Sequence, residues 1–290
     1  MRTEQEMMEL ILGTAREDER IRAVIMNGSR VANELFRDCF QDYDIIYLVT
    51  DFEYFSEHHE WIDRFGERII LEMPAYKDLE PEEYNGIFNY QMLFRDGNRL
   101  DLTFAGTEKA AERVENDPVG RVLLDKDNIL KGVTWQGAGR YLAKAPTKRE
   151  FENSCNSFWW ILQNIAKGLK RRELPYAMRM LEIAREDVDK MISWYIGYRH
   201  EYQVSPGKMG KYFERYLEHQ LWTQYTATFP ECNEKAIWEA LFQACDLYRY
   251  LAEALAEHHA YEYPQEEDRA MVGYLEKVRD MEYRREELEE

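Results

Sequence analysis

Asn27-Gly28-Ser29-Arg30 and, shortly after it, Asp42-Tyr43-Asp44 are the stretches that decide the fold of this chain. The first ends a β-prone run over residues 21–26, and the second leads into another over residues 45–49, so the pattern predicts two strands. A glycine at the end of a strand lets backbone N–H groups approach an anion closely. Residues two apart on a strand point to the same side, so we expect Asp42 and Asp44 to project together.

Two neighbouring carboxylates imply a cation. They repel each other unless positive charge lies between them, and oxygen ligands of this kind suit Mg²⁺. A turn that binds phosphate beside a strand that binds magnesium is typical of enzymes that catalyse phosphoryl or nucleotidyl transfer. The residues therefore predict a magnesium site at Asp42 and Asp44 and a phosphate site at Gly28 and Ser29.

A third carboxylate lies on a predicted hairpin further along the chain. The β-prone runs over residues 88–94 and 100–104 are joined around Asp96-Gly97, a pair typical of hairpin turns. Asp101 stands between two leucines, so by alternation it faces away from both. From the residues alone, a single acid on a strand face is more often solvated surface than a functional group.

The second half of the chain has a different pattern. Residues 132–146 contain three glycines and a proline and are typical of a linker. Thr147 and Glu150 then form a capping box, and apolar residues recur at helical spacing in three long segments that follow. We predict an α+β protein, with a mixed sheet and flanking helices in a domain over residues 1–140 and an α-helical bundle over residues 141–290.

Charge and composition limit the function classes. The formal net charge is −18 and no basic cluster is present, which argues against a nucleic-acid substrate and favours a cationic small molecule. No apolar run reaches the roughly 20 residues that a membrane span needs, and the first residues lack the apolar core of a signal peptide. The four cysteines are scattered, so we expect a cytoplasmic protein with reduced thiols and no membrane partner.

The combination of Gly-Ser with Asp-x-Asp on the next strand resembles the signature of the polymerase-β-type nucleotidyltransferase superfamily. Several further blocks, in order along almost the whole chain, are similar to the aminoglycoside 6-adenylyltransferases: Arg20-Ile21-Arg22, Phe40-Gln41-Asp42-Tyr43-Asp44-Ile45, Asp96-Gly97-Asn98-Arg99-Leu100-Asp101-Leu102-Thr103, Val122-Leu123-Leu124-Asp125-Lys126-Asp127 and Gly207-Lys208-Met209-Gly210-Lys211-Tyr212. The chain diverges from that family after about residue 261.

The resemblance implies a reaction and a set of residues. The reaction transfers AMP from MgATP to the 6-hydroxyl of streptomycin, releases pyrophosphate and inactivates the antibiotic. The family pattern implies metal ligands at Asp42 and Asp44, and it makes Asp101 either the general base or a further metal ligand. The implied contacts to ATP come from Gly28, Ser29, Arg30 and, out of the helical domain, Lys208 and Lys211.

Two other functions stay open at this point. The same chemistry could act on a different small-molecule hydroxyl, or the fold could be a nucleotide-sensing or antitoxin-like binding module without activity. The presence of the Gly-Ser turn together with all three acids argues against a mere binder, because binding alone does not need three carboxylates.

Overall fold

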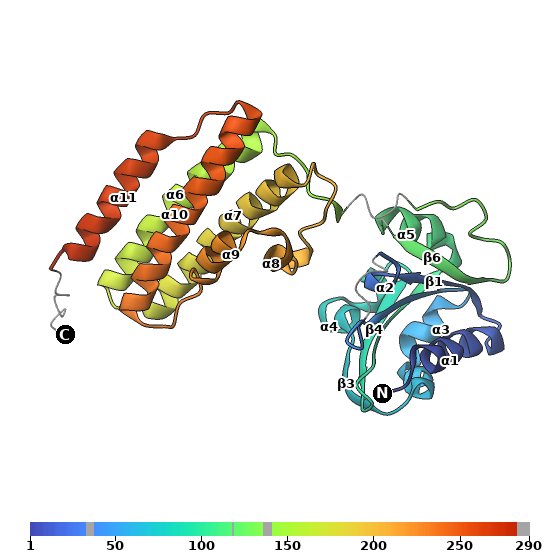
Figure 1. The fold of residues 1–290 in the computed structure, drawn as a ribbon. Coiled ribbons are helices and arrows are strands. Elements are labelled where there is room, and N and C mark those ends of the chain that lie inside the picture. The colour runs from blue at the N-terminus through green and yellow to red at the C-terminus, as the bar shows by residue number, and fades with distance from the viewer. Residues whose placement is uncertain (33–37, 118, 136–140, 283–290) are drawn as a thin grey trace, which may run out of the picture. The chain divides into compact units, whose positions relative to one another are not determined.

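The computed structural model describes residues 1–32, 38–117, 119–135 and 141–282 of the chain. It divides into two compact units, Met1–Arg140 and Tyr141–Glu290, each of which is described by itself (Figure 1). The first unit contains a mixed sheet with helices, and the second is helical throughout its described residues. The predicted fold class, a sheet domain followed by a helical region, is confirmed.

The sheet of the first unit has six strands in the order β3-β4-β5-β2-β1-β6. Strands β2 and β5 are parallel and every other neighbouring pair is antiparallel. The strands are β1 Ile21–Asn27, β2 Tyr43–Val49, β3 Arg68–Glu72, β4 Ile87–Phe94, β5 Arg99–Gly106 and β6 Gly120–Asp125. The predicted runs over residues 21–26, 45–49, 88–94 and 100–104 are β1, β2, β4 and β5; residues 68–72, also typical of a strand, form β3, and β6 was not predicted.

Alternation along the strands separates two faces of the sheet. One face carries large apolar side chains, among them Tyr47 and Phe104, in a buried core that α1 and α3 cover. The opposite face carries a smaller apolar cluster that includes Ala110 of α5. Figure 1 accordingly shows α5 on the other side of the sheet from α1 and α3. The polar side chains of the site lie on the α5 side.

The helices of the first unit are short after the first one. They are α1 Glu4–Glu17, α2 Ser29–Ala32, α3 Phe52–Glu57, α4 Pro74–Asp78 and α5 Ala110–Asn116, with 3₁₀ segments η1 His59–Phe65, η2 Pro81–Glu83 and η3 Thr107–Lys109. Thr3 and Glu6 have the spacing of a capping box, and the structure contains it at the start of α1. Residues 31–36, whose sequence predicts a short helix, lie largely outside the described residues.

Two predicted helices differ in detail. Residues 57–65 have a sequence typical of a helix, but most of them form the 3₁₀ segment η1, because Asp51 accepts a hydrogen bond from the Tyr54 amide and starts α3 earlier, and α3 ends at Glu57. Thr107 is a typical cap for a helix that runs to Asn116, but it begins the 3₁₀ segment η3 instead. Lys109 precedes α5 without a side-chain cap.

The second unit is built on long helices. They are α6 Lys148–Lys170, α7 Leu174–Arg199, α8 Phe213–Tyr216, α9 His219–Thr226, α10 Glu234–His259 and α11 Gln265–Asp280, with a 3₁₀ segment η5 Lys208–Gly210. The predicted capping box of Thr147 and Glu150 starts α6. Aromatic and aliphatic side chains of α6, α7 and α10 form one buried core. The sequence analysis missed α11, and the charged run over residues 282–290 that follows it lies mostly outside the described residues.

Two further findings concern the whole described chain. None of its helices is both long enough and apolar enough to cross a bilayer. All four cysteines are free thiols, two exposed and two buried.

Candidate active site

A row of polar side chains crosses four strands of the sheet. Asn27 at the end of β1 is paired with Asp44 on β2, and Asp44 is paired with Asp101 on β5. The row continues to Gln91 on β4, the partner of Asp101. Because neighbouring strands lie about 4.8 Å apart, the register places the carboxylates of Asp44 and Asp101 side by side. Asp44 and Asp101, which are 57 residues apart in the sequence, therefore lie next to each other on one face of the sheet.

The electrostatics of this row favour a bound cation. Burial raises the pKa of Asp44 to about 6, and the negative charges of Asp101 and Asp42 add to the effect. Burial also raises the pKa of Asp42, against the opposing influence of Arg99. Among the described residues, no hydrogen-bond donor reaches the Asp44 carboxylate. An unneutralised carboxylate between two others is the arrangement that a divalent cation stabilises.

Arg99 holds the other two acids. Its guanidinium donates to both oxygens of Asp101, at 2.8 and 2.7 Å, and its remaining nitrogen lies 3.4 Å from an oxygen of Asp42. In the described part of the chain, no three His, Cys, Asp or Glu side chains are gathered closely enough to hold a metal ion as they stand. At the acid row, the Arg99 guanidinium contacts both Asp42 and Asp101. The carboxylate oxygens of this row suit Mg²⁺, provided that Arg99 gives up at least one of its contacts with them.

The turn after β1 is fitted to Asp44. Gly28 has a φ of +73°, and a Cβ at this position would lie 1.9 Å from a carboxylate oxygen of Asp44. Both the backbone conformation and the space therefore require glycine. Ser29 follows directly, half-buried, at the start of α2. The structure thus brings Gly28, with Ser29 next to it in the chain, against Asp44, where the sequence predicted a phosphate-holding turn.

Arg30 has a different set of contacts from the predicted one. Its guanidinium is buried and donates to the backbone carbonyls of Gln41 and Asp42, at 2.8 and 3.0 Å. The same group lies 3.8 Å from the ring centroid of Tyr43. These contacts hold the segment that carries Asp42 into β2. Contact of Arg30 with phosphate stays a prediction.

A cavity of about 220 Å³ opens over the row. Besides Asn27, Gly28, Asp44, Asp101 and Gln91, its lining includes two residues that the sequence analysis did not single out, Arg113 of α5 and Asp117 just after it. The side-chain amide of Asn27 donates a hydrogen bond to the Asp117 carboxylate at 2.7 Å. No local pattern marks Arg113, because its proximity depends on how α5 packs on the sheet.

Lys208 and Lys211 belong to the second unit. Both are exposed, on and next to the 3₁₀ segment η5, and Gly207 before them has a φ of +77°. The ammonium group of Lys211 lies 5.0 Å from the ring centroid of Tyr212. Their predicted contact with the triphosphate stays a prediction.

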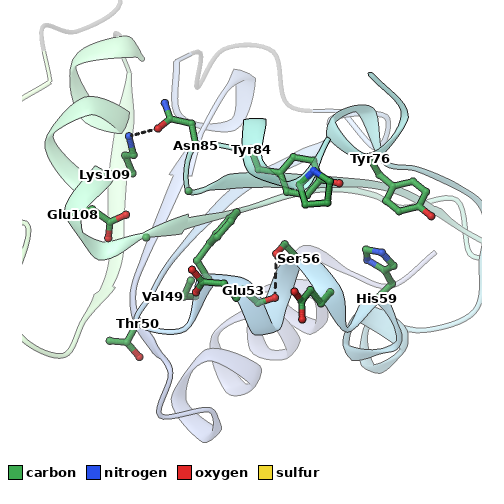
Figure 2. Close-up of a pocket in the computed structure, with 15 residues that line it drawn as sticks. Val49, Thr50, Glu53, Ser56, His59, Tyr76, Tyr84, Asn85, Glu108 and Lys109 are labelled. Atoms are coloured by element: carbon green, nitrogen blue, oxygen red, sulfur yellow. Dashed lines mark hydrogen bonds between the residues drawn. The ribbon is translucent and has the colours of Figure 1, made fainter. Parts of the chain in front are cut away.

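A larger cavity, of about 840 Å³, lies at the opposite ends of the same two parallel strands (Figure 2). Val49 and Gly106, which are paired where β2 and β5 end, line it. Val49 is the fifth residue after Asp44 along β2, which corresponds to a distance of about 16 Å. None of the predicted site residues lines this cavity.

Comparisons with known proteins agree along almost the whole chain. Residues 1–278 match the family described as streptomycin adenylyltransferase. A protein named aminoglycoside 6-adenylyltransferase from Bacillus subtilis (strain 168) is 39% identical over 280 residues, which are 96% of this chain and 98% of the relative. A protein of the same name from Campylobacter jejuni is 37% identical over 266 residues, covering 91% of this chain and 92% of the relative.

One solved structure is also similar. The crystal structure of an aminoglycoside 6-adenyltransferase from Bacillus subtilis is 37% identical, covers 97% of this chain and 100% of its own, and superposes with a TM-score of 0.49.

Proposed function

This chain belongs to the streptomycin adenylyltransferase family, and from that premise we propose that it transfers AMP from MgATP to a hydroxyl group of streptomycin. The 6-hydroxyl is the acceptor that the names of the relatives favour. The observation that carries the proposal is the pairing of Asp44 with Asp101 beneath the turn at Gly28. The proposed cation site and the turn that a phosphate would approach then line the same small cavity.

The chain's own groups orient the triphosphate. Gly28 leaves room for an anion to approach the backbone at the turn, and the Ser29 hydroxyl and amide are groups that can donate to phosphate oxygens. Asp42 and Asp44 would hold the magnesium ion. When bound, that ion supplies positive charge, which neutralises the triphosphate and makes the α-phosphorus more open to attack.

The bond changes are those of an in-line displacement. The acceptor oxygen forms a bond to the α-phosphorus of ATP as the bond from that phosphorus to the leaving oxygen breaks, and pyrophosphate departs. The acceptor hydroxyl loses its proton in this step. Asp101 is the carboxylate proposed to take it, or else to serve as a third metal ligand. Either role requires Arg99 to release an oxygen of Asp101.

The charge of the chain supports a cationic acceptor. Streptomycin carries two guanidinium groups, and a guanidinium forms paired hydrogen bonds with a carboxylate. A net charge of −18 attracts such a molecule and repels nucleic acid. Supply of ATP places the proposed reaction in the cytoplasm, and adenylylation there would inactivate the drug.

The test is release of pyrophosphate by the purified protein. We expect release that requires both Mg²⁺ and streptomycin, and much less with kanamycin, whose cationic groups are ammonium ions on a differently shaped ring system. Release that is equal with the two drugs would contradict the proposed acceptor. Failure to release pyrophosphate with either drug, while MgATP still binds, would favour a different hydroxyl substrate or a binding module.

A further inference from the structure

Two polar groups in the small cavity have no partner in the described part of the chain. The side-chain oxygen of Asn27, a residue only 6% exposed, accepts no hydrogen bond. The Nε of Arg113 is shielded from water and donates none. Both residues line the cavity that holds Asp44 and Asp101. Buried polar groups without partners cost free energy, so each requires an explanation.

The neighbouring acids do not explain Arg113. Asp117 already accepts from the Asn27 amide and, at 3.1 Å, from the backbone amide of Val119. Asp101 is held by both arms of Arg99. Across the described residues, Arg113 forms no ion pair although three carboxylates line the same cavity. An arginine that served the fold alone would be paired with one of them.

We propose that Arg113 binds phosphate oxygens of the nucleotide, an inference that rests on the proposed function. The cavity lining carries Asp44, Asp101 and Asp117 and would repel a triphosphate without positive charge. Arg113 is the cationic side chain among the residues that line it. A guanidinium presents several N–H donors in a plane, which match the oxygens of a phosphate group.

The unpaired oxygen of Asn27 complements this contact. It needs a donor, which the ionised oxygens of a phosphate ester do not offer. A hydroxyl or ammonium group close to the phosphate would satisfy it. A cavity that presents one unmet donor and one unmet acceptor therefore fits a phosphorylated ligand with a hydroxyl or an ammonium neighbour.

The experiment measures binding of MgATP, magnesium pyrophosphate and adenosine by calorimetry. In Arg113→Gln we expect MgATP and pyrophosphate to bind about tenfold to a hundredfold more weakly, with adenosine unchanged. Arg113→Lys, which keeps the charge and loses the planar fork, should recover part of the loss. Arg95→Gln is the matched control, because Arg95 is an exposed arginine of the same unit that pairs with Glu67 on the surface.

The outcomes separate this inference from the function on which it rests. If the wild-type protein binds MgATP and Arg113→Gln binds it equally well, Arg113 is not a phosphate ligand and the proposed function stands. An equal loss for adenosine and MgATP in both Arg113 variants would show a structural role and also overturn the inference. A wild-type protein that binds neither MgATP nor pyrophosphate would overturn both proposals.

Discussion

The two ends of the parallel pair β2 and β5 carry cavities that differ in size and in chemistry. The cavity at the carboxyl ends is almost four times as large, at about 840 against 220 Å³. Several of its polar groups have partners: Ser56 donates to the Glu53 carbonyl at 3.1 Å, and Lys109 donates to Asn85 at 3.2 Å (Figure 2). The smaller cavity holds Asn27 and Arg113, each with one buried polar atom that has no hydrogen-bond partner among the described residues.

The difference teaches that the candidate site is identified by polar groups without partners among the described residues, and not by the volume of the cavity. Hydrogen bonds within the protein already satisfy groups in the larger cavity, so a ligand there gains less by contacting them. In the smaller one, a carboxylate with a raised pKa and an arginine whose Nε has no hydrogen-bond partner among the described residues both gain by meeting a metal and a phosphate. Substitutions at matched positions in the two regions can test this comparison.

The largest effect is expected for Asp44→Asn. The substitution keeps the size of the side chain and removes the charge that would hold Mg²⁺, so AMP transfer should fall by at least about a thousandfold. Glu53→Gln makes the corresponding change in the larger cavity and should leave turnover near that of the wild type. The measurement is kcat for pyrophosphate release. Equal losses in the two variants would remove the distinction between the cavities.

The next largest effect is expected for Gly28→Ala. The new methyl group would collide with Asp44, so turnover should fall by about a hundredfold or more through displacement of that carboxylate. Gly132→Ala is a matched control, because Gly132 has a φ of +84° and nothing within 4 Å of an added Cβ. Both variants should lose about 1 kcal/mol of stability from backbone strain, and only Gly28→Ala should lose activity. Similar turnover in the two would show that the fit to Asp44 is unimportant.

The raised pKa of Asp44 predicts a pH dependence of stability in the metal-free protein. A carboxyl with a pKa of about 6 when folded and about 4 when unfolded binds protons more tightly in the folded state. The free energy of unfolding should therefore decline as pH rises from about 4 to about 6 and level off above that. The decline is at most about 3 kcal/mol, and solvent screening at this half-buried position makes it smaller.

Urea unfolding in a chelator at several pH values measures this decline, and Asp44→Asn should remove most of it. Glu53→Gln should leave it in place. A curve for Asp44→Asn that parallels the wild type would assign the effect to other groups.

The smallest effect concerns Arg99→Gln. Without the guanidinium, Asp42 and Asp101 lose their neutralising partner, so the metal-free variant should be less stable by about 1 kcal/mol. Millimolar Mg²⁺ should restore the variant more than it stabilises the wild type, because the cation no longer competes with Arg99. Thermal melts with and without Mg²⁺ measure this difference. A variant that gains no more from Mg²⁺ than the wild type would show that Arg99 and the metal do not share a position.

The comparison also shows what local sequence can reveal. The runs that became β1 and β2 are almost continuously apolar and β-prone, whereas those that became β4 and β5 alternate, and both patterns depend on neighbours only a few residues away. Gly28 was identifiable because a glycine after a buried strand has few explanations other than a turn or a close approach. The capping boxes at Thr3 and Thr147 are equally local, since three residues separate the two partners.

The sequence by itself therefore determined all strands except β6, the turn and the identity of the acids, because each depends on short-range spacing. Only the tertiary structure decided that Asp44 stands beside Asp101, because that register depends on pairing between distant strands. It also decided that Arg30 supports the backbone, that Arg99 holds two of the acids, and that Arg113 reaches the cavity unpaired. Long side chains find their partners across the fold, and no spacing along the chain encodes which partner is nearest.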